Sequence, residues 1–232
     1  MSDERRANAG LLGDIIGKGF GGGLFTEQAA WTDAQWDAHD REIDAQKATE
    51  ETEADAQRQR SKVSGLVSRG FSRRSIDAAL VADLDAPAIA IMRDWSAAHP
   101  REGIAVLSGL PGCGKTVAAT WWGLNTEWAS CVRAATFATA SRYDQETRKG
   151  WMTASALVLD DLGSEYADAK GSFLVDLDEL IDIHYGNRDR MVITTNCTAD
   201  EFKNRYGSRI VDRLRECGSW LSVGGASMRK KS

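Results

Sequence analysis

The sequence lacks any uninterrupted apolar run that approaches the roughly 18 residues of a membrane-spanning helix. It also lacks a secretory signal, because its first residues, MSDERRANAG, are polar and contain no apolar core. We therefore expect a soluble protein that stays in the cytoplasm and has no membrane partner. At 232 residues, with 42% hydrophobic and 27% charged residues, the chain can form one sizeable α/β domain with a smaller appendage.

Paired cysteines and an excess of positive charge are missing as well. Four cysteines lie far apart without a C-x-x-C pair, and no histidine stands at metal-ligand spacing, so we expect reduced thiols and no zinc site. The net charge of −5 disfavours a protein that binds nucleic acid over its whole surface. Local basic patches remain compatible with that charge.

The charge is distributed unevenly, which indicates how the chain is organised. Residues 26–57 contain ten acidic and two basic side chains, whereas residues 58–74 contain six basic side chains and no acid. The first two dozen residues are rich in glycine and are expected to be flexible. A capping box at Thr32–Gln35 predicts one or two helices through about Val67, with a thin apolar stripe. We predict a helical arm over residues 1–70 that is either a solvated tether or a docking arm for another protein.

From residue 71 onward, apolar runs alternate with helical patterns. This alternation predicts an α/β domain over residues 71–232, with a five-stranded, mainly parallel sheet that helices cover on both faces. Ligands of such a fold bind at the carboxyl ends of the strands. The predicted strands are 104–108, 131–139, 156–161, 191–196 and 220–223. Two predicted helices, 75–82 and 88–98, lead into the sheet, and a third, 116–128, follows the first strand.

Residues 109–116 read GLPGCGKT, a complete G-x-x-x-x-G-K-T phosphate-binding loop between an apolar run and a helical pattern. Glycines at this spacing let successive backbone N–H groups face the phosphates, and the following helix start adds partial positive charge. Lys115 is expected to reach the β and γ phosphates, and Thr116 to bind Mg²⁺. The alternative is a chance glycine-rich turn. The predicted nucleotide contacts are Gly109, Pro111, Gly112, Cys113, Gly114, Lys115, Thr116 and Val117.

Two further strand ends carry polar groups suited to triphosphate chemistry. The run 156–161 ends in Asp160, expected to hold Mg²⁺ through water, and Asp161, expected to orient or polarise the attacking water. Glu165 is a weaker candidate for the role of Asp161. Asn196 ends the next run, where its amide is expected to bond the γ-phosphate or the water. The alternatives are a carboxylate that caps the next turn and a turn-forming asparagine.

Arg209 and Arg213 lie four residues apart, so on a helix they share one face. A solvated basic face is the default explanation for this spacing. The other motifs favour an arginine presented to the γ-phosphate of a neighbouring subunit, where such a finger accelerates hydrolysis by about 10³ to 10⁵.

Five motifs occur in the order GLPGCGKT, ALVLDDLGSE, VITTN, SRIVDRLRECG and GASMR. Together they resemble the AAA+ ATPase domain of the DnaC/DnaI and IstB family over roughly residues 70–231. The resemblance implies ATP and Mg²⁺ as cofactors, and no C-terminal lid domain, because the sequence ends soon after the fifth strand. It also assigns roles: phosphate and Mg²⁺ contacts to Lys115 and Thr116, the acidic box to Asp160 and Asp161, the sensor to Asn196, the finger to Arg213 with Arg209 beside it, and a terminal S-x-R motif to Ser227 and Arg229.

Members of this family divide into two branches, and the resemblance implies one of them. DnaC-like proteins load a replicative hexameric helicase onto single-stranded DNA and use an N-terminal arm to grip it, whereas IstB-like proteins bind duplex DNA and assist a transposase. The acidic arm suits a protein partner, so we expect a bacterial or phage-encoded helicase loader, with the transposition helper as alternative. We also expect a slow Mg²⁺-dependent ATPase stimulated by DNA or partner, and a homo-oligomer formed on ATP and DNA.

Two other classes of protein are alternatives to an ATPase with this phosphate loop. A small-molecule P-loop kinase is not expected to carry both the double-Asp strand end and the paired arginines. A switch that binds nucleotide without appreciable hydrolysis remains open.

Candidate DNA contacts are spread over the ATPase domain, and each can equally be a solubilising charge or a core aromatic residue. We expect core packing for at least three of the four tryptophans. The candidates are Arg142, Arg148, Lys149, Lys203, Arg205, Arg215, Lys230, Lys231, Trp121, Trp122, Trp128 and Trp151.

Overall fold

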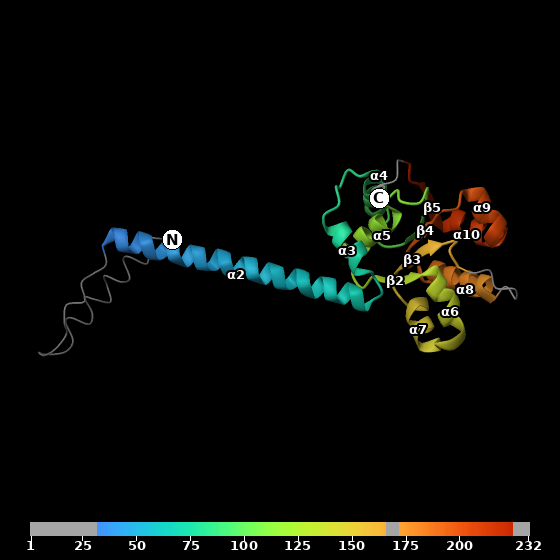
Figure 1. Ribbon diagram of the computed structural model, residues 1–232, viewed down its shortest axis with the longest axis horizontal. Helices are drawn as coiled ribbons and strands as arrows, with labels where there is room; N and C mark the ends of the chain where they lie inside the picture. Colours follow the sequence, from blue (N-terminus) through green and yellow to red (C-terminus); the bar gives the residue numbers. More distant parts are fainter. Residues whose placement is uncertain (1–31, 166–171, 225–232) are drawn as a thin grey trace, which may run out of the picture. The chain divides into compact units, whose positions relative to one another are not determined.

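The computed structural model describes residues 32–165 and 172–224 of the chain (Figure 1). Contacts divide the chain into two units, Met1–Ala54 and Asp55–Ser232. The glycine-rich start predicted to be flexible lies outside the described residues, as do Lys230, Lys231 and the terminal motif with Ser227 and Arg229. The proposed domain boundary near residue 70 remains a prediction.

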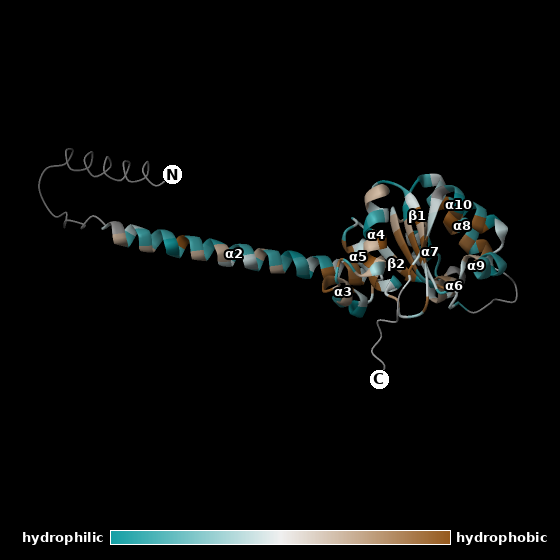
Figure 2. Cartoon of the chain, turned by 90° about the horizontal axis from the view of Figure 1, so that it is seen from above, coloured by the Kyte–Doolittle hydropathy of each residue, from teal (hydrophilic) through white to brown (hydrophobic). Residues whose placement is uncertain are grey.

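Helix α2 runs without a break from Asp33 to Ser68. At its start the side chain of Gln35 accepts from the backbone N–H and the hydroxyl of Thr32, at 2.8 and 3.0 Å. Most of the helix is hydrophilic (Figure 2). Its last turns belong to the second unit, where Val63 and Leu66 are buried in an apolar cluster with residues of that unit.

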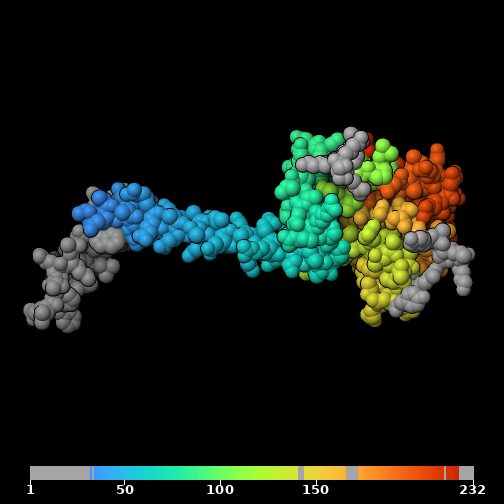
Figure 3. Space-filling model, viewed as in Figure 1, coloured from blue at the N-terminus to red at the C-terminus, as the bar shows by residue number. Residues whose placement is uncertain are grey.

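Two short helices lead into the sheet. Helix α3 spans Arg73–Leu80. Ser72 caps its N-terminus, because its side chain accepts from the backbone N–H of Ser75. Helix α4 spans Pro87–Ala98, with the proline in its first turn, where a missing N–H costs nothing. The α3–α4 segment forms one flank of the second unit, and the segment from α8 to α10 forms the opposite flank (Figure 3).

The sheet has five strands in the order β2-β3-β4-β1-β5, and every neighbouring pair is parallel. The predicted five-stranded parallel α/β fold is confirmed. The strands are β1 (Gly103–Ser108), β2 (Ser130–Arg133), β3 (Ala156–Leu162), β4 (Arg190–Thr195) and β5 (Gly218–Ser222).

Strand residues alternate between two apolar clusters, one on each face of the sheet. Ala105 and Leu107 join the cluster formed with α3, α4 and α5, whereas Ile104 and Val106 join the cluster on the opposite face. Burial on both faces explains why these strands read as continuous apolar runs. The remaining helices are α5 (Lys115–Leu124), α6 (Ala134–Tyr143), α7 (Gln145–Met152), α8 (Ser172–Asn187), α9 (Ala199–Tyr206) and α10 (Ser208–Cys217).

Two predicted elements were too long. The strand expected over 131–139 ends at Arg133, and helix α6 begins at Ala134. The alanine-rich segment favours a helix, and its buried residues Ala134 and Phe137 stand three apart rather than two. Helix α5 ends at Leu124 instead of Trp128, whose backbone is left-handed with φ of 56°.

Gly70 allows α2 to turn into the core, and we expect Gly70→Ala to destabilise the protein. The backbone φ of Gly70 is 95°, and an added Cβ would lie 2.0 Å from the carbonyl oxygen of Cys131. Strain of this kind should lower the free energy of unfolding by about 1 to 3 kcal/mol, measured by urea denaturation. The control is Gly150→Ala within α7, whose Cβ meets nothing within 4 Å and which should be neutral or stabilising by up to about 1 kcal/mol. Equal unfolding midpoints for both variants would refute this role of Gly70.

Candidate nucleotide site

The phosphate loop connects the carboxyl end of β1 to the start of α5. Gly112 and Gly114 adopt left-handed backbone angles, φ of 87° and 94°, so the loop curls before the helix begins. Pro111 is exposed, whereas Cys113 is buried. Val117 packs against the apolar cluster beneath α5. The eight residues predicted to contact nucleotide thus form one continuous loop and first helical turn.

Lys115 is buried to 8% exposure, although it carries a charge. Its Nζ donates to the carbonyl oxygens of Gly109 and Leu110, at 2.7 and 2.9 Å. The loop therefore holds the ammonium group by its own carbonyls, which compensates the charge in a desolvated position. Phosphate oxygens are stronger acceptors of the same type, so the ammonium is suited to exchange one partner for the other.

Asp160 joins three elements at the carboxyl edge of the sheet. The hydroxyls of Thr116 and Thr194 both donate to its Oδ1, at 2.9 and 2.7 Å. Asp160 and Thr194 are buried, and Thr116 is exposed at the start of α5. A hydroxyl and a carboxylate in contact behind a phosphate loop provide the oxygen ligands that Mg²⁺ prefers. The donor set therefore fits the predicted metal.

Asp161 lies at a β-bulge, where the register of β3 against β4 shifts between Leu159 and Leu162. Its φ of 62° is unusual for a residue other than glycine, and its N–H donates to the hydroxyl of Thr194. Its carboxylate lies 3.4 Å from Nδ2 of Asn196 and 3.4 Å from Nη2 of Arg133. The structure thus brings together the two predicted residues, Asp161 and Asn196, and adds an arginine.

Arg133 and Thr194 were missed by the sequence reasoning. Arg133 was placed inside a strand that was predicted six residues too long, so it was not expected at the edge of the sheet. Thr194 stands two residues before Asn196 and was treated as part of the apolar run. Two features of the sequence could have placed both residues at the edge of the sheet. They are the alternation of side chains along a strand and the double-Asp motif on the neighbouring strand.

Glu165 does not join this cluster of side chains. Its carboxylate is 2% exposed and accepts from Nε of Arg205 at 3.0 Å, the hydroxyl of Tyr206 at 2.7 Å and the backbone N–H of Gly163 at 2.7 Å. Burial, followed by the hydrogen bond to Glu165, raises the pKa of the Tyr206 phenol well above its usual range. These contacts attach the segment after β3 to helix α9.

Arg209 and Arg213 share one face of α10, as the spacing predicts, and both pair with α8 of the same chain. Nη1 of Arg213 lies 2.6 Å from both Asp178 and Asp182, and this arginine is 23% exposed. Nη2 of Arg209 lies 3.3 and 3.7 Å from the same carboxylates, and Arg209 is 69% exposed. The face is therefore neutralised by two aspartates rather than solvated alone.

The candidate DNA contacts behave differently from one another. Arg148 is engaged by Asp176 and Glu179 of α8, and Arg205 by Glu165. Among the tryptophans, Trp122 is fully buried, and Trp121 and Trp151 pack against the two apolar clusters. Core packing is thus confirmed for three of the four. Trp128 is 74% exposed.

No protein-family model and no curated protein matches the sequence. Among solved structures, the chain is similar to the crystal structure of the DnaC helicase loader, with a TM-score of 0.54 and 21% identity over 66% of this chain and 100% of that chain. The chain has a DnaC-like AAA+ fold.

Two DnaA structures show the same AAA+ architecture at lower identity. DnaA bound to AMPPCP and single-stranded DNA gives a TM-score of 0.52 and 13% identity, over 68% of this chain and 52% of that one. Domain III of the Thermotoga maritima DnaA gives 0.51 and 16%, over 66% of this chain and 68% of that one. The fold predicted from the order of the motifs is thereby confirmed. In the described part of the chain, no helix is both long and apolar enough to span a membrane.

We expect Glu165→Ala to destabilise the second unit, because it leaves a buried phenol and a backbone N–H without their acceptor. The expected loss is about 2 to 4 kcal/mol in the free energy of unfolding, measured by urea denaturation. Glu127→Ala, which removes an exposed carboxylate, should change stability by less than about 0.5 kcal/mol. If Glu165→Ala is as stable as the control but hydrolyses ATP more slowly, the structural role is wrong and the role in water activation returns.

Proposed function

We propose that this chain is a DnaC-like helicase loader that binds and hydrolyses ATP with Mg²⁺. One observation carries the proposal. The hydroxyl of Thr116 donates to Oδ1 of Asp160 at 2.9 Å, although the two residues are 44 positions apart in sequence, and both lie behind a phosphate loop that holds a buried lysine. Loop, hydroxyl and strand-end carboxylate are the parts that a P-loop ATPase requires. The similarity to the DnaC loader covers that entire chain, which supports the same kind of role here.

The residues of the edge divide the chemical work among them. Lys115 and the loop N–H groups bind the phosphates. Thr116 and Asp160 would hold Mg²⁺, and the bound ion would supply positive charge beside the transferred phosphoryl group. Asp161 orients the attacking water and accepts its proton, and Asn196 donates a hydrogen bond to the water or the γ-phosphate. Arg133, 64% exposed, lies 3.4 Å from the carboxylate of Asp161 and positions it.

Arg213 completes the site of a neighbouring protomer, with Arg209 beside it. In the single chain Arg213 is held by Asp178 and Asp182, so it must exchange two carboxylate contacts for the γ-phosphate of its neighbour. Hydrolysis then depends on assembly, so we expect a slow basal rate and stimulation by DNA or a partner. We propose a homo-oligomer that forms on ATP and DNA.

Two inactive variants should restore activity when they are mixed. Lys115→Ala disables the cradle and Arg213→Ala the finger, so in an equal mixture about a quarter of the interfaces pair an intact cradle with an intact finger. We expect each variant alone to be inactive and the mixture to recover a corresponding share of steady-state ATP hydrolysis. The control mixes Lys115→Ala with the double variant Lys115→Ala/Arg213→Ala, which should recover none. No recovery in the first mixture, with assembly intact by light scattering, would refute a shared site.

The arm provides the expected contact with the helicase. Residues 26–57 are strongly acidic, which suits a protein partner and disfavours a phosphate backbone. Single-stranded DNA is then left to the ATPase assembly. The solved DnaA structure with single-stranded DNA supports that arrangement for this fold.

The choice of partner is tested with the full chain and with residues 55–232. This cut keeps Val63 and Leu66, which are core residues, whereas a cut at residue 70 would remove them. We expect the immobilised full chain to retain the replicative hexameric helicase of its host, and residues 55–232 to retain at least tenfold less while still binding ATP. Retention of a transposase instead, or equal retention of the helicase by both forms, would overturn the loader assignment.

A further inference from the structure

We propose that Trp128 and Arg69 form a base-stacking site for single-stranded nucleic acid. The inference deepens the proposed function and rests on it, because it names where the ATPase unit contacts the strand. Trp128 precedes the first residue of β2 by two positions, so it lies at the amino end of a parallel sheet. The nucleotide site lies at the carboxyl end, so the two sites occupy opposite edges.

Trp128 sits in a position that packing does not explain. Its exposed fraction is 74%, whereas Trp122 in the preceding helix is fully buried. Its φ of 56° is left-handed, a conformation that penalises a bulky side chain and is natural for glycine or asparagine. The residue therefore has an unfavourable backbone and an exposed indole without a packing gain. An outlier of this kind is a reason to look for a ligand.

Arg69 is fixed beside the indole by the backbone. Its Nε donates to the carbonyl of Ala129 at 2.9 Å, and its own carbonyl accepts from the N–H of Cys131 at 2.8 Å. The guanidinium carbon lies 6.0 Å from the centre of the Trp128 ring, within the range of a cation–π contact. Arginine and indole are thus held as one unit by the strand that follows.

Arg69 also lacks the acidic partner that other arginines have. Within residues 32–165 and 172–224, no carboxylate lies within 4.0 Å of its guanidinium, in contrast to Arg133, Arg148, Arg205 and Arg213. Its remaining N–H donors are therefore available for an anion.

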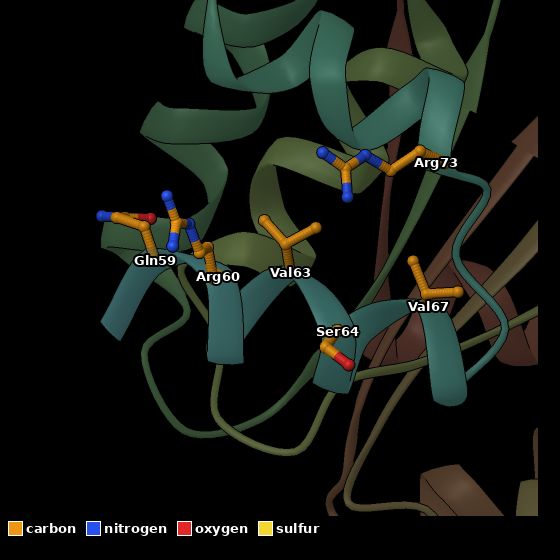
Figure 4. Close-up of a pocket in the computed structure, with 6 residues that line it drawn as sticks. All are labelled: Gln59, Arg60, Val63, Ser64, Val67 and Arg73. Carbon is orange, nitrogen blue, oxygen red and sulfur yellow. The ribbon is translucent and has the colours of Figure 1, made fainter. Parts of the chain in front are cut away.

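The sequence around Arg69 is basic. It belongs to the acid-free stretch 58–74, whose Arg60 and Arg73 line a groove of about 510 Å³ on the last turns of α2 (Figure 4), and Arg73 is also paired with Asp77. Val63 and Val67 line the floor of this groove, and Arg69 follows Val67 by two residues. The net charge of the whole chain is −5, so this basic stretch is the part of the chain that is expected to bind phosphates. Glu127 is the acidic residue nearest to Trp128 in sequence, and the basic residues of the stretch 58–74 outnumber it.

This chemistry favours an unpaired strand over a duplex or a protein. An exposed ring face stacks on a base only if that base is not already stacked within a helix, and the adjacent guanidinium then binds the neighbouring phosphate. Bases in a duplex present edges rather than faces. The site is expected to tolerate any base sequence, because every base has a π face.

The test uses the full chain with Mg²⁺ and AMPPCP and measures anisotropy of a labelled oligothymidylate. Trp128→Gly should weaken binding by about 5- to 100-fold, and Trp128→Phe, which keeps a ring, by much less. Arg69→Ala should weaken binding and lower the slope of log affinity against log salt by about one. Leu84→Ala, which removes an exposed apolar side chain elsewhere, is the control and should bind like the wild type.

Stability separates a binding role from a structural one. Trp128→Gly relieves the left-handed strain, so its urea midpoint should equal or exceed that of the wild type while its affinity falls. If wild type binds the strand and Trp128→Gly binds equally well, this site is wrong and the proposed function stands. If the wild type itself does not bind, both fail. Unchanged DNA binding with lost helicase retention in Trp128→Gly, or an equal Trp128-dependent affinity for duplex, would also overturn the inference.

Discussion

The hydrogen bonds at Asp160 are the constraint on which the site depends. One buried carboxylate oxygen accepts from Thr116 at the start of α5 and from Thr194 at the end of β4, while Asp160 itself belongs to β3. Three elements that are distant in sequence therefore meet at a single atom. Without partners a buried carboxylate is strongly unfavourable, so these contacts and the order of strands support each other. The hydroxyl of Thr194 also accepts from the N–H of Asp161, and this hydrogen bond fixes the left-handed backbone of Asp161.

Ion pairs within the chain divide its arginines into two groups. Arg133, Arg205 and Arg213 are paired with carboxylates of the second unit, and these pairs connect β2 to β3, α9 to the segment after β3, and α10 to α8. A paired arginine near the site has a defined position before nucleotide arrives, so less conformational freedom is lost on binding. Arg69 has no carboxylate partner among the described residues, although its Nε is fixed by a backbone carbonyl. An arginine that is paired with a carboxylate is positioned in advance for the proposed site. An arginine without such a partner is suited to bind an anion from outside the chain.

The sequence predicted the parts of the fold that depend on local pattern. Five apolar runs marked five strands, and the phosphate loop and the double-Asp end marked the edge of the sheet that is proposed for nucleotide chemistry. Boundaries failed where a residue suits two structures: the alanines of 134–138 pack in α6 with helical spacing, yet they also fit the end of a strand. Contacts between elements were not predictable, because Arg205 and Tyr206, the partners of Glu165 on α9, lie 40 and 41 residues away and depend on how the chain returns. The same holds for the pairing of α10 with α8.

The division of charge along α2 bears on both proposals. The acidic stretch ends at residue 57 and the contacts divide the chain after Ala54, so the change in charge nearly coincides with the start of the second unit. Beyond this point Val63 and Leu66 are buried with the residues of α3 to α5, and the basic side chains of the same turns belong to the second unit. One continuous helix thus carries acid where a protein partner is proposed and base where a phosphate is proposed. The 36 residues of α2 can therefore meet both electrostatic requirements, because the part proposed to dock and the part that packs are separated along the helix.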